Sequence, residues 1–168
     1  MPSPDTGFRA RPLLDRELAM EAIQLALPSI QAALQRPGVS GEQVLHLVVL
    51  DPHAQPGAAA FEEAVLCEYS VGNPQEWGAD YRGFARSKAE LSWRLGCDTH
   101  AVQEMRPHLL QEGDSLLWGG VWRDGLVVAA SGAHPWFDEA FANAVAGFLL
   151  ALAQERARAA REQGRLTL

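Results

Sequence analysis

The stretch WGGVWRDGLVVAASGAHPWFDEA, residues 118–140, decides the fold of this protein. Two apolar runs flank Asp124-Gly125, and an Asp-Gly pair between such runs is a strong signal for an antiparallel hairpin. Acidic residues follow at Asp138-Glu139, where they favour the positive end of a helix. The stretch therefore predicts a hairpin that leads directly into a helix. Its predicted elements are strands at Leu116–Trp122 and Leu126–Ala130 and a helix from about Phe137 to Gln163.

The chain before this stretch repeats the same types of element. Apolar residues at helical spacing indicate a first helix over Leu13–Arg36, which Pro28 should kink or divide. Two β-rich runs, Val44–Leu50 and Ala64–Val71, indicate another hairpin. Two further helices are expected between the hairpins. They are expected within residues 73–96, ending at Gly96 as a C-cap, and from residue 98 to about residue 110.

The predicted order of elements is α-β-β-α-α-β-β-α. Two hairpins with few parallel crossovers imply an antiparallel sheet with helices packed on it, which is the α+β class. We expect a sheet of four to five strands flanked by helices. The length of 168 residues predicts a single domain over residues 13–168. Residues 1–12, rich in Pro, Ser, Asp and Gly, predict a flexible N-terminal arm.

Composition excludes several functional classes. The net charge of −7 argues against a nucleic-acid or anionic-membrane partner, since such partners require clustered positive charge. No apolar run approaches the roughly 18 residues of a membrane helix, and the N-terminus does not resemble a signal peptide. We therefore expect a cytoplasmic protein. The histidines and two cysteines form no metal-binding spacing, so no metal site is predicted, while a Cys67–Cys97 disulfide stays open.

The glycine pattern resembles a known family. The succession of Gly119-Gly120, Asp124-Gly125, Ser131-Gly132 and Asp138-Glu139, followed by an Ala-rich helix, resembles the GlcG/HbpS-like superfamily, also called the haem-degrading domain family. The resemblance covers about residues 44–155 and is closest to the family's short, uncharacterised branch. It implies a profilin-like fold, oligomers, and binding of haem or another small molecule without established catalysis.

Lys88, Gly119, Gly120, Ser131 and Gly132 are the candidate ligand-binding residues. The glycines permit positive φ or a close approach by another backbone or a ligand. Lys88 lies on the apolar face of its helix, where it either extends to water along its stem or directs its ammonium into a pocket. We expect these residues to bind a small anionic molecule. An unchanged affinity in Lys88→Met would contradict this hypothesis.

The sequence leaves the cofactor and the functional class more open than the fold. Three residues could ligate haem iron by their chemistry, but none is carried over from the family motif: Cys97, His100 and His134. Ser131 lies in A-S-G-A and lacks the motif of a nucleophilic serine. We expect a non-enzymatic, self-associating small-molecule binding protein. The alternatives are a profilin-like interaction module, in which Trp118 and Trp122 share one sheet face, and an enzyme of unknown reaction.

Overall fold

The computed structural model describes residues 13–165 and residue 167, so the predicted N-terminal arm lies outside the described residues. Its centre is an antiparallel four-stranded sheet in the order β2-β1-β4-β3. The mixed helix and antiparallel-sheet class that the sequence predicts is confirmed. The strands are β1 (Leu45–Leu50), β2 (Val65–Val71), β3 (Gly120–Arg123) and β4 (Leu126–Ser131).

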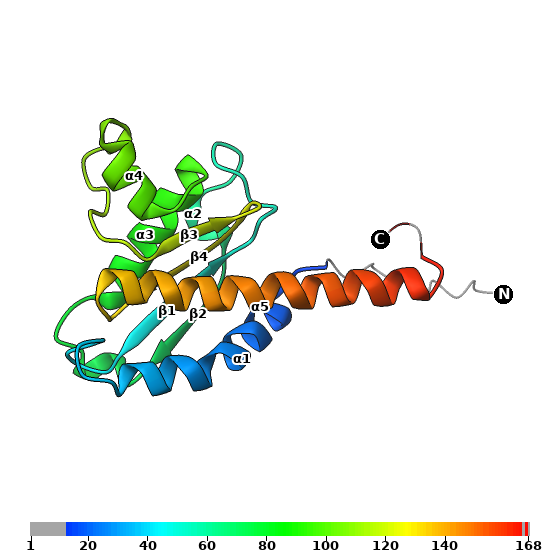
Figure 1. Ribbon diagram of the computed structural model, residues 1–168. Helices are drawn as coiled ribbons and strands as arrows, with labels where there is room; N and C mark the ends of the chain where they lie inside the picture. The colour runs from blue at the N-terminus through cyan, green and yellow to red at the C-terminus, as the bar shows by residue number, and fades with distance from the viewer. Residues whose placement is uncertain (1–12, 166, 168) are drawn as a thin grey trace.

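Helices cover both faces of the sheet. The long helix α5 (Pro135–Glu162) and α1 (Arg16–Leu34) lie side by side on one face, and α3 (Tyr81–Leu95) covers the other (Figure 1). The shorter helix α4 (Thr99–Met105) follows α3 after a left-handed C-cap at Gly96, as predicted. The remaining short elements are α2 (Phe61–Ala64) and the 3-10 turns η1 (Pro74–Glu76) and η2 (Pro107–Leu109).

Strand alternation divides the core into two layers. Along β1, Leu45, Leu47 and Val49 belong to the large core under α1 and α5, whereas Val48 and Leu50 belong to a smaller core under α3. The smaller core also contains two alanines of α3, Ala85 and Ala89, whose small side chains let this helix approach the sheet. His46 has the same parity as Val48 and therefore faces α3.

Three features differ from the prediction. The helix expected from residue 98 to about residue 110 ends at Met105, and a separate 3-10 turn follows it. Pro28 neither ends nor divides α1, because it lies on the exposed face, where the carbonyl that loses its partner can bind water. The strand expected from Leu116 begins only at Gly120. Leu116 is 72% exposed and Gly119 has a φ of +125°, so the residues before Gly119 do not join the sheet. Trp118 therefore does not share a strand face with Trp122.

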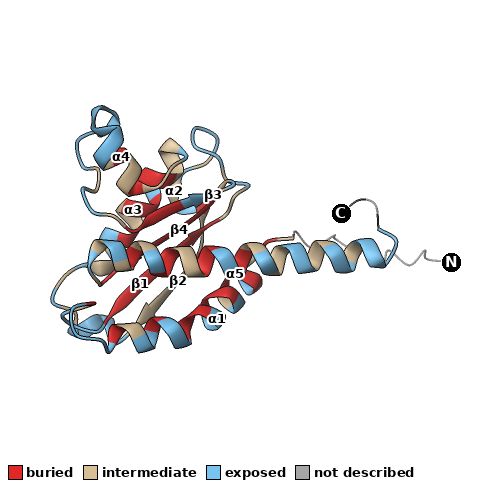
Figure 2. Cartoon of the chain, in the orientation of Figure 1, coloured by how far each residue is buried: buried red, intermediate tan, exposed pale blue. Residues whose placement is uncertain are grey.

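The helix α5 extends well beyond the sheet (Figure 1). By length and composition alone it could cross a membrane. Its first half packs on the sheet and α1 through buried residues between Asp138 and Leu149, whereas its second half is largely exposed or half-buried (Figure 2). The first half thus has the packing of a core helix.

Candidate functional site

The structure brings the five predicted site residues together around a buried ion pair. The ammonium of Lys88 donates to Oδ2 of Asp138 at 2.8 Å and to the carbonyl oxygen of Ala130 at 3.0 Å. Its third partner is Oγ of Ser131, at 3.2 Å. Three donors on Lys88 thus meet three oxygen atoms, and the side chain is fully buried and does not reach water.

Asp138 completes this cluster from the first turn of α5. Its Oδ1 accepts a hydrogen bond of 2.9 Å from the backbone N–H of Ala133. Burial raises the pKa of Asp138 to about 6, although Lys88 and the backbone N–H groups of Gly132 and Ala133 oppose that shift. Burial likewise lowers the pKa of Lys88, and the charge of Asp138 opposes it. Each group therefore offsets the cost of burying the other.

The glycines of the motif permit close contacts within the protein. A Cβ atom on Gly119 would lie 2.6 Å from the carbonyl oxygen of Ala130 and 3.0 Å from Nζ of Lys88. One on Gly120 would lie 2.6 Å from the carbonyl oxygen of Lys88, and one on Gly132 would lie 2.3 Å from that of Val44. The space that these glycines leave is thus occupied by the protein's own backbone and the Lys88 ammonium. Ligand binding by the five residues stays a prediction.

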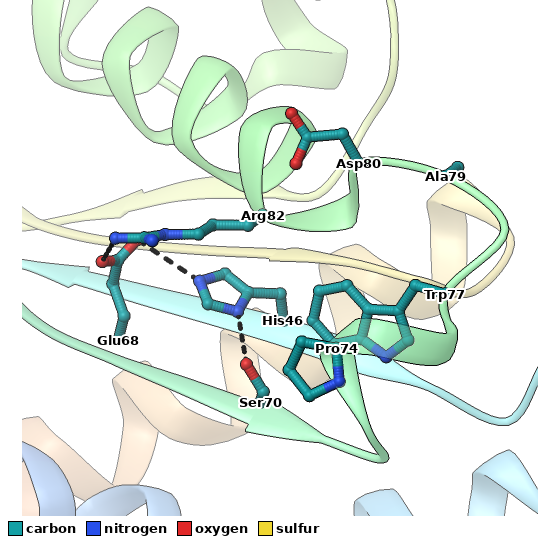
Figure 3. A pocket seen from close by; sticks show the side chains of 8 residues that line it. All are labelled: His46, Glu68, Ser70, Pro74, Trp77, Ala79, Asp80 and Arg82. Atoms are coloured by element: carbon teal, nitrogen blue, oxygen red, sulfur yellow. Dashed lines mark hydrogen bonds and ion pairs between the residues drawn. The ribbon is translucent and has the colours of Figure 1, made fainter.

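A separate pocket of about 660 Å³ lies on the face of the sheet that α3 covers, at the N-terminal end of that helix (Figure 3). This volume falls within the range of about 300–1,000 Å³ that is usual for small-molecule sites. The pocket combines aromatic, charged and hydroxyl side chains from β1, β2, α3 and the segment that joins β2 to α3. Its lining residues are His46, Glu68, Ser70, Pro74, Trp77, Ala79, Asp80 and Arg82.

Strand register gathers the polar floor of this pocket. His46 on β1 pairs with Ser70 on β2 and with Ser131 on β4. Glu68 lies two residues before Ser70 and therefore points to the same face. Nδ1 of His46 lies 2.9 Å from Oγ of Ser70, and its Nε2 lies 3.3 Å from Oε1 of Glu68. His46 is therefore a hydrogen-bonded residue of the sheet.

Glu68 is held by two arginines of α3. Arg82 donates to it through Nε and Nη2, at 3.3 and 2.8 Å, and Arg86 donates through Nη1 at 3.0 Å. Burial opposes ionisation of Glu68, but hydrogen bonds from Arg82, Arg86 and His46 outweigh it and lower its pKa to about 2. Burial lowers the pKa of His46, while Glu68 opposes that shift. The floor of the pocket therefore consists of an ionised Glu68 held by Arg82 and Arg86, together with the neutral imidazole of His46.

Glu42 holds the segment that carries Trp77. Its Oε2 accepts from the backbone N–H of Gly78 and its Oε1 from the hydroxyl of Tyr81, both at 2.9 Å. The indole of Trp77 meets the ring of His46 edge-on, with centroids 5.9 Å apart, and it contacts Tyr81 in the same manner. These contacts place Trp77 and Pro74 as the apolar end of the pocket (Figure 3).

Polar groups at the start of α3 remain available to a ligand. Arg82 uses Nε and Nη2 on Glu68, which leaves its Nη1 as a donor. Asp80 caps α3 through Oδ1, which accepts from Gly83 at 2.9 Å, so its Oδ2 remains an acceptor. The pocket thus combines one donor, one acceptor and an aromatic wall. A planar polar molecule matches this set.

Haem, the cofactor that the sequence resemblance implies, does not fit this pocket. Both ring nitrogens of His46 are engaged in hydrogen bonds, so neither is free to bind iron. The carboxylate of Asp80 would also face the haem propionates and repel them. Elsewhere in the described chain, the ring of His134 stacks on Trp136 with centroids 5.1 Å apart.

Both cysteines are free thiols, so the disulfide left open by the sequence is not formed.

Comparison with known proteins supports the fold. No family model matches the sequence, and no curated protein matches it. The fold is similar to that of the Klebsiella pneumoniae protein ORFY, described with the family model DUF336, with a TM-score of 0.53 and 15% identity over 90% of this chain and 98% of ORFY. A PduOC:haem complex gives a TM-score of 0.47 and 18% identity over 77% of this chain and 91% of the other. The likeness to ORFY, which has the GlcG-like fold, shows the fold alone.

Sequence reasoning missed most of the pocket. Glu68 and Ser70 alternate along β2 and share the parity of His46 across the hairpin, which is a signal of a polar patch on a buried face. Trp77 and Arg82 carry no such signal, because their place depends on how the segment after β2 turns back over the sheet.

Proposed function

We propose that this protein is a small-molecule binding protein whose binding site is the pocket between β1, β2 and the start of α3. The observation that carries the proposal is a pocket of suitable size with a fixed polar floor and an aromatic end. Its side chains are already ordered by hydrogen bonds, so little entropy would be lost when a ligand binds.

The ligand class follows from charge and shape. The lining carries two carboxylates and one guanidinium, which already pairs with Glu68. An anionic ligand would be repelled by Asp80, and the charge of Arg82 is already paired with Glu68. We therefore propose a neutral, planar molecule with adjacent hydrogen-bond donor and acceptor groups, which would face Asp80 and Arg82 while its ring contacts Trp77.

The experiment is a calorimetric titration with three planar probes, nicotinamide, uracil and adenine, and with haemin as a fourth. We expect saturable binding of at least one planar probe, weakened about tenfold or more in Trp77→Ala, because base–aromatic contacts contribute about 1–3 kcal/mol. Trp93→Phe is the matched control, since Trp93 lies outside the lining and donates to the carbonyl oxygen of Ala54. Binding of haemin alone, or equal weakening in both variants, would contradict the proposal.

No reaction is proposed for this pocket. Within the described residues that line it, no nucleophile lies beside a free base. Nδ1 of His46 is hydrogen-bonded to the hydroxyl of Ser70, and its Nε2 is hydrogen-bonded to Glu68. Self-association and a cytoplasmic location also remain proposals. Light scattering tests the first, and a clean monomer would contradict it.

A further inference from the structure

Three side chains with metal-binding chemistry meet at the other edge of the sheet. Asp98 is the N-cap of α4, His100 lies in its first turn, and Glu139 lies in the first turns of α5. One donor atom from each lies within 4.8 Å of the other two. His100 Nδ1 is in direct contact with Glu139 Oε2. This cluster shares no residue with the pocket, which lies beside β2, whereas Asp98 contacts β3.

We propose that Asp98, His100 and Glu139 bind a divalent first-row transition-metal ion such as Zn²⁺. Two carboxylates and one imidazole nitrogen supply two negative charges and three ligand atoms, which match a divalent ion that keeps one or more water ligands. Imidazole nitrogen favours this group of ions over Mg²⁺ and Ca²⁺, which prefer oxygen ligands throughout.

The side chains are accessible to an ion from solvent. The exposed fractions of the Asp98, His100 and Glu139 side chains are 15%, 33% and 19%. They are half-buried, so their orientation is restrained while water and ions can still reach them. A site deep in the core would require the fold to open, whereas this one requires only small side-chain rotations that move His100 and Glu139 apart, so that each lies about 2.0–2.2 Å from a bound Zn²⁺.

Neighbouring groups orient the Asp98 carboxylate. Its Oδ1 accepts from the backbone N–H of Trp122 at 2.8 Å and from Nη1 of Arg123 at 2.7 Å. Arg123 is itself held by Asn143, whose Oδ1 accepts from Nη2 at 2.6 Å. Oδ2 of Asp98 is then the oxygen available to a metal ion. Such outer contacts typically fix ligating carboxylates in metal sites.

A bound ion would join parts of the chain that are otherwise connected by few contacts. It would link α4 to the start of α5, next to the buried Asp138. The indole of Trp118 lies beside the site, with its ring centroid 5.2 Å from that of His100. Trp118 is therefore a built-in reporter, because a paramagnetic ion such as Co²⁺ bound to His100 should quench its fluorescence.

The test uses tag-free protein and calorimetric titration with Zn²⁺, together with Co²⁺ quenching of tryptophan fluorescence. We expect one Zn²⁺ per chain, with affinity reduced at least tenfold in His100→Ala and in Glu139→Gln. The quenching should be weaker in Trp118→Phe than in the wild-type protein. His53→Ala is the matched control, because His53 forms a histidine–carboxylate pair with Asp51 at 2.9 Å that has no third ligand among the residues that the structure describes.

Several outcomes would overturn the proposal. These are absence of Zn²⁺ binding to the wild-type protein, equal affinity in wild type and His100→Ala, loss of binding in His53→Ala, or binding of Ca²⁺ as tight as that of Zn²⁺. Glu139→Gln preserves the size of the side chain, so a circular-dichroism spectrum like that of wild type shows that its lost affinity is not a loss of folding. A rise in the melting temperature of wild type with Zn²⁺, absent in Glu139→Gln, is a second expected result.

Discussion

Nζ of Lys88 lies 2.8 Å from Oδ2 of Asp138, with the two side chains only 1% and 2% exposed. The only lysine of the sequence thus forms a buried ion pair between α3 and α5. Burial of two charges is costly, and the carbonyl oxygen of Ala130 and the N–H of Ala133 satisfy part of the remaining hydrogen-bonding capacity. The pair joins helices on opposite faces of the sheet, at the end where β4 finishes.

Lys88→Met should destabilise the protein by about 3–5 kcal/mol, because it leaves the Asp138 carboxylate buried without its partner. The double variant Lys88→Met/Asp138→Leu should recover most of that loss, since an apolar pair of similar volume needs no charge compensation. Urea unfolding at neutral pH measures both. A stability of Lys88→Met within about 1 kcal/mol of that of the wild type would show that the buried pair contributes little to the stability of the fold.

Glu68 should make the stability of the protein depend on acidity. Its pKa falls from 4.5 to about 2 on folding, so its contribution is present above about pH 4.5 and is lost as the pH falls toward 2. Glu68→Gln should cost about 1.5–3 kcal/mol at pH 7, the usual range for a hydrogen bond to a charged group.

Urea unfolding at pH 7, 5 and 3 measures this dependence. The difference in stability between wild type and Glu68→Gln should be similar at pH 7 and 5 and should narrow at pH 3. A difference that stays constant over this range would mean that Glu68 titrates normally.

Gly132 should be intolerant of any side chain. It has a φ of +144°, and a Cβ atom there would lie 2.3 Å from the carbonyl oxygen of Val44 and 2.8 Å from the Cα of Leu45, both backbone atoms that cannot move easily. We expect Gly132→Ala to destabilise the protein by more than about 2 kcal/mol.

Gly147 provides the matched control for Gly132. It lies in α5, where a Cβ atom would meet nothing within 4 Å, so Gly147→Ala should stabilise the protein by about 0.5–1 kcal/mol. Thermal unfolding of both variants checks the pair. Similar melting temperatures for the two would contradict the close approach at Gly132.

Local turn chemistry explains how much of the fold could be predicted. Asp124 and Gly125 both have positive φ, as a tight hairpin turn requires, and Gly96 adopts the left-handed conformation of a C-cap. The prediction of a strand from Leu116 was wrong. The apolar residues of this segment suit a strand as well as a loop, and only tertiary contacts leave Leu116 in solvent. The prediction that Pro28 would divide the first helix was wrong, because its exposed position in the fold cannot be seen from one sequence.

Site prediction was limited by long-range contacts. The expected proximity of Lys88 to Ser131 is confirmed at 3.2 Å, but Asp138 was assigned only to the helix dipole, although it meets the ammonium directly. His100 and Glu139 are far apart in the sequence, so no motif spacing reveals their contact. Such contacts are set by the packing of α4 and α5 around β3, which has no local signature.

The central claim, that the pocket beside Trp77 binds a planar polar molecule, is tested most directly by two-dimensional ¹H–¹⁵N NMR. Nicotinamide, uracil and adenine are titrated into the labelled protein while the indole N–H signals of Trp77 and Trp93 are followed, assigned with Trp77→Ala and Trp93→Phe. We expect a saturable shift of the Trp77 indole signal and of the backbone amide signals of His46, Ser70 and Arg82, and an unchanged Trp93 signal. No saturable shift at Trp77 with any of the three probes, or shifts clustered around Trp93 instead, would contradict it.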